Sequence, residues 1–264
     1  MTMATAMSTW FWRGAYEWRT WRKRDHEPEL RIVAALVDPQ RVALDIGANR
    51  ALYTTVLRRL ARKVHSFEPM PHLAARLRSA FPDVEVHEVA LSNTSGEVKL
   101  RLPGTNTSWA TIEPHNKLEK ARGELREVTV RMARVDDFPL APVGFVKVDV
   151  EGHEIAVLEG AHDLLARDRP VLLVELEERH TPNALGNAGA LLAPLGYAGY
   201  FLDRVDARDV LRPLSQFDAA RDASPTHVSE KGKIGRYINN FVFLPSTTAG
   251  GVTERLRASG VTVG

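Results

Sequence analysis

The sequence of 264 residues contains no cysteine. This absence excludes disulfide frameworks, thiolate zinc sites and cysteine nucleophiles, and it leaves the redox compartment undecided. The sequence also lacks an apolar run of roughly 18 residues, the length that a bilayer-spanning helix requires. Its N-terminus has no uninterrupted apolar segment followed by a small-residue cleavage site. We therefore expect a cytoplasmic protein.

An excess of charge of one sign is missing as well. The chain carries 35 Lys and Arg against 33 Asp and Glu, which gives a formal net charge of +2. A dedicated nucleic-acid binder normally presents a strong basic field, so this balance favours small-molecule chemistry and argues against a nucleic-acid partner. With 44% hydrophobic residues, the chain is long enough for one large α/β domain with a full core.

Short apolar runs alternate with helical patterns along the chain. Between the runs, apolar side chains recur on one helical face, as at Leu52, Val56 and Leu60. This alternation predicts a doubly wound, mostly parallel sheet, in which ligands bind beyond the carboxyl ends of the strands. The predicted strands span residues 42–46, 64–67, 84–91, 145–150 and 171–176.

The segment 103–126 departs from this alternation. It is polar and rich in turn residues, and it lies between the strand-like runs EVKLRL and EVTVRM. We expect a long loop or cap of the kind that often selects substrates.

The first 27 residues are aromatic and basic, and they hold four of the five tryptophans. Phe11, Ala15, Trp18 and Arg22 share one stripe of a predicted helix. One interpretation is that this helix packs on its own domain or on a partner subunit. The other is that residues 8–24 dock peripherally on a membrane or on an anionic glycolipid.

The stretch DIGANRALYT, residues 45–54, has the features of a nucleotide-binding loop. Gly47 allows close approaches that other residues do not, and a helix that begins near Arg50 directs free N–H groups at whatever lies above the strand. Glu68 comes 68 − 45 = 23 positions after Asp45, where such folds keep an acid for ribose hydroxyls. A nicotinamide dehydrogenase would show the same pair, but the stretch GANRAL lacks its second glycine.

A third stretch, FVKVDVEGHEIAVLEGA at residues 145–161, completes a set of motifs. Taken with DIGANRALYT and the strand end FEP, it resembles the FkbM family of S-adenosylmethionine-dependent methyltransferases, whose motifs are DxGANxGxYT, FEP and KxDxEGxE. The stretches VEVHEVALSNTSGEVKL, VLLVEL and NNFVFLP are also similar to that family, so the resemblance covers roughly residues 27–245.

The resemblance implies a class I methyltransferase fold, α/β and Rossmann-like, with a mostly parallel seven-stranded sheet whose last strand is antiparallel. The methyltransferase domain would span residues 28–246, after the aromatic segment 1–27 and before a tail at 247–264. The family methylates hydroxyls of sugars, lipid-linked glycans and polyketides, with S-adenosylmethionine as the cofactor. We therefore expect an O-methyltransferase that acts on a sugar, a glycolipid or a polyketide-type small molecule.

The resemblance also implies which residues contact the cofactor. Glu68 would accept hydrogen bonds from the ribose, the next two residues would flank the adenine, and Ser92 is a weaker candidate on the adenine side. The simpler alternatives are turn chemistry for Asp45 and Asn49 and a solvated strand end for Glu68. The full set of implied cofactor contacts is Asp45, Gly47, Asn49, Ala51, Tyr53, Glu68, Pro69, Ser92 and Asp149.

Methyl transfer to a hydroxyl benefits from a general base within hydrogen-bond reach. The candidates on or just past predicted strand ends are Asp149, Glu151, His153 and Glu175. We favour His153 as the base, because its titration range suits proton acceptance, and Asp149 as a positioning residue. Glu151 equally suits a helix N-terminus, and His153 equally suits a solvated helix. Asp149 and Glu151 could share a divalent cation, but two carboxylates are too few to predict a metal site.

Position 51 departs from the family motif, since Ala51 replaces a glycine. If that glycine serves close packing of helix against strand, one added methyl group is tolerated, and we favour this outcome. If the backbone requires a positive φ, alanine costs on the order of 1 kcal/mol and cofactor affinity falls. The second case leads to an alternative function, a degenerate, non-catalytic protein of this fold that binds a glycan or a partner.

Overall fold

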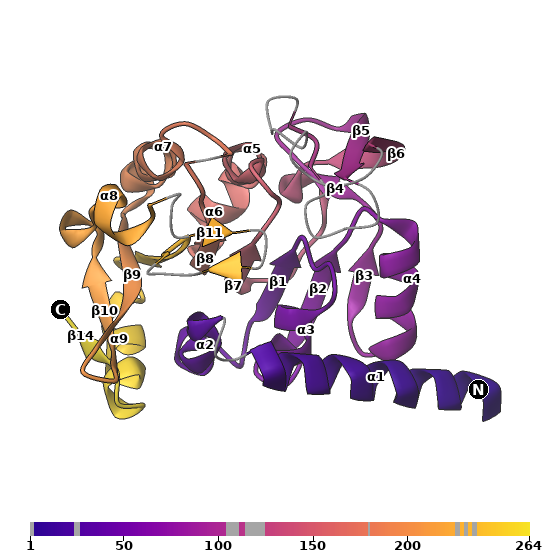
Figure 1. Cartoon of the computed structure of the whole chain (residues 1–264), viewed down its shortest axis with the longest axis horizontal. Coiled ribbons are helices and arrows are strands. Elements are labelled where there is room, and N and C mark those ends of the chain that lie inside the picture. Colours follow the sequence, from indigo (N-terminus) through magenta and orange to yellow (C-terminus); the bar gives the residue numbers. More distant parts are fainter. Residues whose placement is uncertain are drawn as a thin grey trace.

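A nine-stranded sheet with helices on both faces forms the body of the protein in the computed structural model (Figure 1). The structure describes residues 3–23, 27–103, 111–113, 125–178, 180–224, 228–229, 232–233 and 237–264. In spatial order the strands of this sheet are β14 (Thr262–Val263), β10 (Arg208–Pro213), β9 (Tyr197–Val205), β13 (Asn240–Pro245), β8 (Val171–Glu175), β7 (Val143–Val148), β1 (Val42–Ile46), β2 (Lys63–Phe67) and β3 (Glu85–His87).

The strand directions confirm the predicted doubly wound α/β class. β3, β2, β1, β7 and β8 are parallel to one another, and β13 is antiparallel to both of its neighbours, β8 and β9. The sheet has nine strands rather than the seven predicted, because β10 pairs with β9 and β14 then pairs with β10. Residues 247–264, predicted as a tail, thus contribute a strand to the sheet and the helix α9 (Ala249–Ala258).

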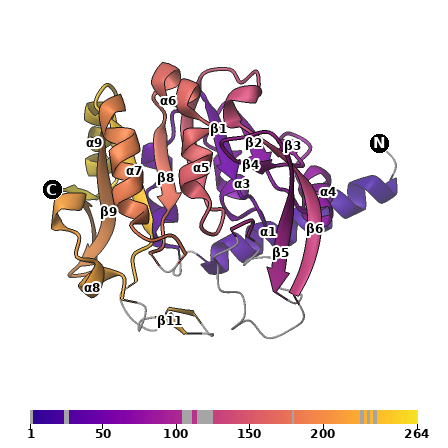
Figure 2. The ribbon, with the colours of Figure 1, turned by 90° about the horizontal axis from the view of Figure 1, so that it is seen from above.

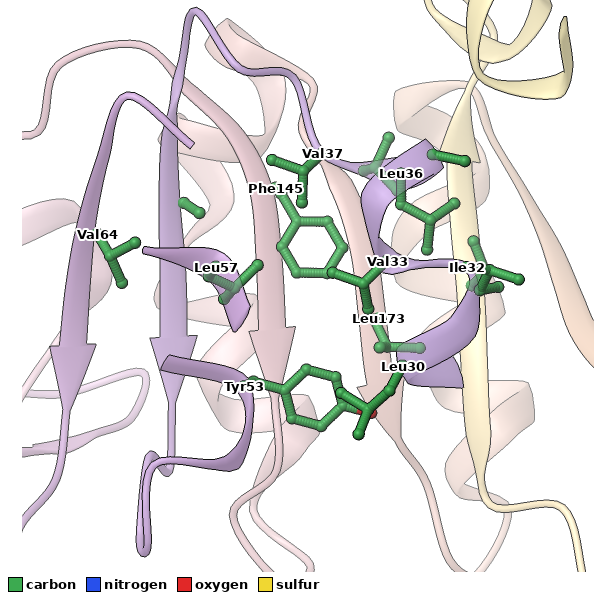
Figure 3. Close-up of a cluster of buried hydrophobic side chains, with 14 of the residues drawn as sticks. Leu30, Ile32, Val33, Leu36, Val37, Tyr53, Leu57, Val64, Phe145 and Leu173 are labelled. Atoms are coloured by element: carbon green, nitrogen blue, oxygen red, sulfur yellow. The ribbon is translucent and has the colours of Figure 1, made fainter. Parts of the chain in front are cut away.

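Two hydrophobic cores separate the sheet from its helices. Phe145 and Leu173 belong to the first core, whereas their chain neighbours Val146 and Leu172 belong to the second. This alternation is expected of a sheet that is buried on both faces. Figure 3 shows the first core, which the helices α1 to α4 and α9 cover, and the helices α5 to α7 cover the second. The helices are α1 (Met3–Lys23), α2 (Val33–Leu36), α3 (Leu52–Leu57), α4 (Pro71–Ala80), α5 (Glu154–Glu159), α6 (His162–Asp168), α7 (Ala184–Leu192), α8 (Ala219–Asp222) and α9.

The single strand predicted over residues 84–91 is wrong. β3 ends at His87, and β4 (Ala90–Leu91) joins a separate three-stranded sheet in the order β4, β6 (Leu125–Ala133), β5 (Gly96–Pro103). Ala90 packs into a small third core with Met70 and Leu73, so it is buried by neighbours outside the two cores of the nine-stranded sheet. An apolar run reports burial but not the identity of the pairing strand.

The β5–β6 pair carries the predicted loop or cap at its tip. Figure 2 shows this pair at the β3 end of the molecule, far from α9. Within the predicted segment the structure describes Thr111, Ile112 and Glu113, and Thr111 forms an isolated bridge with Arg101. The rest of the segment between the two strands lies outside the described residues. A further two-stranded ribbon joins β11 (Val228–Ser229) to β12 (Gly232–Lys233).

The N-terminal segment is a helix that packs on its own domain. α1 lies against α3 and α4 along one edge of the molecule (Figure 1). Tyr16 and Thr20 are buried, and the Tyr16 ring lies 5.6 Å from that of Phe81. Trp18 and Trp21 point outward and are 59% and 69% exposed. The side chains of residues 3–11 lie outside the described part, and membrane docking stays a prediction.

In the part of the chain that the structure describes, no helix has the length and apolar character that crossing a bilayer would need.

We predict that Tyr16→Ala lowers the free energy of unfolding by about 3 kcal/mol, because a buried aromatic ring is lost from the interface of α1 with the domain. Trp21→Ala on the same helix is the matched control and should change it by less than about 0.5 kcal/mol, since this side chain is mostly exposed. Urea unfolding of both variants measures the difference. Equal, small effects would show that α1 contributes little to the fold.

Candidate active site

The loop after β1 is fastened to two neighbouring strand ends. The N–H groups of Gly47 and Ala48 both donate to the Phe67 carbonyl, at 3.0 and 3.1 Å, and the Asp149 N–H donates to the Ile46 carbonyl at 3.0 Å. Gly47 has φ +81°, and a Cβ atom there would lie 1.8 Å from the Asp149 carbonyl oxygen. Only glycine fits this position, and its lack of a side chain allows the loop after β1 to approach the loop after β7.

The packing interpretation of Ala51 is wrong in its premise. Ala51 has φ 60° and ψ 27°, in the left-handed region, and Asn49 has φ 44°. Asparagine tolerates this region well, whereas alanine there costs on the order of 1 kcal/mol. The Ala51 methyl group is fully buried in the first core, which offsets part of that cost. The effect on cofactor affinity stays a prediction.

A row of polar side chains crosses the sheet just below this loop. Asp45 is in register with Ser66 on one side and with Lys147 on the other. Thr54 of α3 donates to Asp45 Oδ2 at 2.5 Å and lies 2.8 Å from the Ser66 hydroxyl. Burial raises the pKa of Asp45 to about 6. Asp45 therefore ties α3 to β1 rather than presenting a free carboxylate.

Lys147, the lysine of the KxDxEGxE motif, is the residue of this row to which the sequence analysis gave no role. It is 1% exposed, and its ammonium donates to the Val148 carbonyl at 3.1 Å and to Asn240 Oδ1 at 3.0 Å. Burial lowers the pKa of Lys147, but the carboxylates of Asp149 and Glu175 and of more distant acids outweigh burial and raise it overall. A signal was present, since a lone lysine in the apolar strand VGFVKV stands two residues before an aspartate and so on the same face.

Two buried polar atoms beside this row have no hydrogen-bond partner within the described part of the chain. The Tyr53 hydroxyl and Asn49 Oδ1 lack a hydrogen bond among the residues that the structure describes. A buried polar atom left unpaired costs about 1–3 kcal/mol, so one donor and one acceptor are available to a ligand. Figure 3 shows Tyr53 at the end of the first core where the strand arrowheads lie.

Glu68 connects the loops that follow β1 and β2. Its Oε2 accepts the Asn49 N–H at 2.7 Å, and its Oε1 accepts the Met70 N–H at 2.9 Å. Glu68 is 4% exposed, and burial raises its pKa to about 7 although both backbone bonds lower it. Each carboxylate oxygen has two lone-pair directions, so both can still accept a hydroxyl of a ligand. The sequence alternative of a solvated strand end does not describe this buried side chain.

The turn after β7 is held in a strained shape. Glu151 has φ 53° and Gly152 has φ 101°. Glu154 Oε1 accepts the N–H groups of Val150 and Gly152 at 3.2 and 3.0 Å, while Thr181 donates to the Gly152 carbonyl at 2.7 Å. Such strain persists only where surrounding bonds fix it, and it is common at functional sites.

His153 stands in the middle of a hydroxyl, imidazole and carboxylate chain. Its Nδ1 lies 2.5 Å from Glu113 Oε1 and its Nε2 lies 2.8 Å from the Ser92 hydroxyl. With Nδ1–H donating to the carboxylate, Nε2 carries the lone pair and accepts the hydroxyl proton. This is the arrangement of an oriented general base. The sequence analysis missed Glu113, because it lies 40 residues from His153 and nothing marks it within a polar loop.

Two of the other three candidate bases, Glu175 and Glu151, contact different partners. Glu175 accepts a hydrogen bond from the Asn239 amide, and burial, followed by the charge of Asp149, raises its pKa well above the ordinary value. The Glu151 carboxylate lies 3.4 Å from His180 Nε2. The structure therefore brings Asp149 and Glu175 close enough to Lys147 for their charges to interact. The described contacts of His153 are with Glu113 and Ser92, and not with Glu151 or Glu175.

The convergent group of three metal-capable side chains that the described residues contain is His65, Glu85 and His87, on β2 and β3. It does not include Asp149 or Glu151, so the shared cation considered for that pair gains no third ligand from the described residues.

Comparison with known proteins gives a family match for the part of the chain that contains these loops. A model of the methyltransferase FkbM domain matches residues 45–206, more than half of the chain. Methyltransferase 1 of Beauveria bassiana (strain ARSEF 2860) is 26% identical in an alignment 144 residues long, which covers 46% of this chain and 58% of that protein. The chain therefore matches little more than half the length of this relative.

Solved structures with a similar arrangement are distant in sequence. Methyltransferase FkbM from Methylobacillus flagellatus KT aligns with a TM-score of 0.46 and 16% identity, covering 78% of this chain and 44% of that one. A candidate methyltransferase from Streptococcus mutans in complex with SAH aligns with a TM-score of 0.46 and 10% identity, covering 82% and 95%. These overall likenesses are low, and the family match rests on the sequence.

We predict that Glu154→Gln is more stable than the wild type at pH 8 but not at pH 4. The glutamine Oε1 can keep both backbone bonds, while the buried titrating group is removed. Burial raises the pKa of Glu154 from 4.5 to about 7, so the folded state binds more protons than the unfolded state in this window. The wild type therefore loses stability as pH rises from 4.5 through 7, by up to about 3 kcal/mol relative to the variant. Urea unfolding at both pH values measures this difference. A wild type that is more stable at pH 8 would show that the turn N–H groups keep Glu154 ionised.

Proposed function

Because the chain belongs to the methyltransferase FkbM domain family, we propose that it is an S-adenosylmethionine-dependent O-methyltransferase acting on a hydroxyl of a sugar, glycolipid or polyketide-type small molecule. The observation that carries the proposal is the chain from Glu113 through His153 to the Ser92 hydroxyl. It provides a base for a hydroxyl proton at the edge of the sheet where the β1 loop lies. O-methylation needs such a base, because a neutral hydroxyl is a weak nucleophile.

The residues of the β1 and β2 loops fit the cofactor. Tyr53 OH can donate to its carboxylate and Asn49 Oδ1 can accept from its ammonium, and both atoms are buried and unpaired among the described residues. Glu68 can accept from the ribose hydroxyls through the free lone pairs of its carboxylate. Pro69 and Met70 follow directly and would flank the adenine. When bound, S-adenosylmethionine supplies an electrophilic methyl group on a positively charged sulfur, which leaves as a neutral thioether.

The protein's own residues hold the acceptor and move its proton. The Ser92 hydroxyl lies at His153 Nε2. An acceptor hydroxyl would either replace it there or transfer its proton to His153 through Ser92. His153 accepts the proton as the acceptor oxygen bonds to the methyl carbon. Glu113 on Nδ1 stabilises the resulting imidazolium. Asp149 positions the β7 turn against Gly47 through its backbone, and correct placement of reacting groups supplies about 7–11 kcal/mol of barrier reduction in favourable cases.

The second candidate is a degenerate member of the family that binds a glycan or a partner without methylating it. The left-handed Ala51 in the cofactor loop favours it, since a strained loop binds its ligand more weakly. Isothermal calorimetry with S-adenosylhomocysteine separates the candidates, because the degenerate protein would not bind it.

We predict that Glu68→Gln weakens S-adenosylhomocysteine by about tenfold to a hundredfold, because charge-assisted bonds to the ribose are lost. Glu88→Gln is the matched control, since Glu88 is an exposed carboxylate that pairs with Arg78. This variant should bind S-adenosylhomocysteine with the wild-type affinity. Calorimetry gives the dissociation constants, and a thermal scan verifies folding. Unchanged affinity in a folded Glu68→Gln variant would contradict the cofactor site.

We predict that His153→Ala lowers methyl transfer by about a hundredfold while S-adenosylhomocysteine affinity stays within about threefold, because a general base acts on the reaction and not on cofactor binding. The measurement is incorporation of labelled methyl from S-adenosylmethionine into small molecules of a cell extract from the source organism. His162→Ala, which removes an exposed histidine of α6, should retain the wild-type rate.

The same label tests the acceptor chemistry. A methyl ether survives mild alkali, whereas a methyl ester is hydrolysed. Alkali-labile label would contradict methylation of a hydroxyl, and equal rates in both histidine variants would remove His153 from the mechanism.

A further inference from the structure

A pocket of about 460 Å³ lies between α1, α4 and the β1 loop. We refer to it as the arginine pocket, because three arginines from these three elements line it. The residues that line it include Arg19, Arg50, Arg76, Trp12, Tyr16 and Trp18. The mechanism above uses none of these side chains.

Among the described residues, the three guanidinium groups have no acidic partner. None of Arg19, Arg50 and Arg76 forms a salt bridge with a carboxylate of the described residues, and Arg19 Nε is buried without a hydrogen-bond partner. Burial lowers the pKa of Arg19, and the charge of Arg50 lowers it further, which shows that the two groups are close enough to repel. The nearby carboxylate of Glu68 already accepts two backbone N–H groups. Like charges gathered in this way are stabilised by an anion with more than one negative charge.

The walls of the pocket suit a ring next to that anion. The Arg76 guanidinium lies 4.9 Å from the centre of the Trp12 ring, so it is held over an indole. Trp18 lines the pocket and is 59% exposed, so it offers apolar ring surface to a ligand. Arginine forks match phosphate oxygens in pairs, and indole surfaces pack on flat rings and on sugars.

We propose that the arginine pocket binds the phosphate group of a phosphorylated acceptor, with the ring of that acceptor against the indoles. This proposal rests on the methyltransferase function and narrows its acceptor to a phosphate ester. The cofactor itself does not account for the pocket, because the one anionic group of S-adenosylmethionine is its carboxylate, to which the Tyr53 hydroxyl is proposed to donate, and its sulfonium is repelled by arginines. Arg50 follows Asn49 in the loop after β1, so the pocket adjoins the loop proposed to hold the cofactor.

Calorimetry of the full chain with inorganic pyrophosphate, glucose 1-phosphate and glucose tests the proposal. We expect the two phosphates to bind and glucose not to bind. Arg19→Gln should weaken pyrophosphate by about tenfold to a hundredfold, since a charge-assisted bond is lost. Arg13→Gln removes the same charge from the same helix at a residue that pairs with Glu17 outside the pocket, and it should change affinity by less than about twofold.

Five outcomes decide the matter. Absence of pyrophosphate binding overturns the proposal. Equal binding by Arg19→Gln and Arg13→Gln means an adventitious ion only and also overturns it. Arg19-dependent pyrophosphate binding by a chain that does not bind S-adenosylhomocysteine keeps the pocket and removes the methyltransferase function. Arg19-dependent binding to phosphatidylglycerol vesicles, but not to phosphatidylcholine vesicles or glucose 1-phosphate, assigns the phosphate to a lipid headgroup. Arg19-dependent binding of glucose 1-phosphate assigns it to a free phosphate ester.

Discussion

The candidate active site depends on one buried cation, the ammonium of Lys147. It lies on β7 with two hydrogen bonds, one to the Val148 carbonyl and one to Asn240 of β13, two strands away in the same sheet. Asp149 stands 3.9 Å away, and the carboxyl groups of Asp45 and Glu175 are close enough to raise the pKa of Lys147. Removing one member of such a buried set leaves charges without compensation, which destabilises far more than the set as a whole contributes. Lys147 therefore allows several carboxylates to gather at the carboxyl ends of the strands.

The loops above this cluster are shaped by close approach and by backbone strain. Gly47 comes against the Asp149 carbonyl because it has no Cβ atom. Asn49, Ala51 and Glu151 have positive φ, and the bonds of Glu68 and Glu154 to backbone N–H groups fix the loops on either side. The three residues with positive φ lie in the loops after β1 and β7, where the Tyr53 hydroxyl and Asn49 Oδ1 have no hydrogen-bond partner among the described residues. A bound ligand that satisfies these atoms would recover part of the energy that the strained loops cost.

The N-terminal helix α1 packs on the domain and also lines a candidate binding pocket. Tyr16 fastens α1 to the domain at Phe81, and this docking places Arg19 opposite Arg50 and Arg76. The outward indoles of Trp18 and Trp21 are left exposed. The same helix thus contributes to the stability of the fold and forms a charged pocket next to the cofactor loop.

The sequence by itself determined the doubly wound class, four of the five predicted strands and the positions of the three motifs, because strand periodicity and motif residues at strand ends are local properties of the chain. It did not determine where residues 84–91 change sheets, because an apolar run reports burial and not its partner. The left-handed backbone at Ala51 was also decided by the tertiary structure, since the same residue is compatible with either loop shape. The pairing of Glu113 with His153 joins segments 40 residues apart. Such contacts arise only when packing brings distant loops to one edge of the sheet, and no local pattern encodes them.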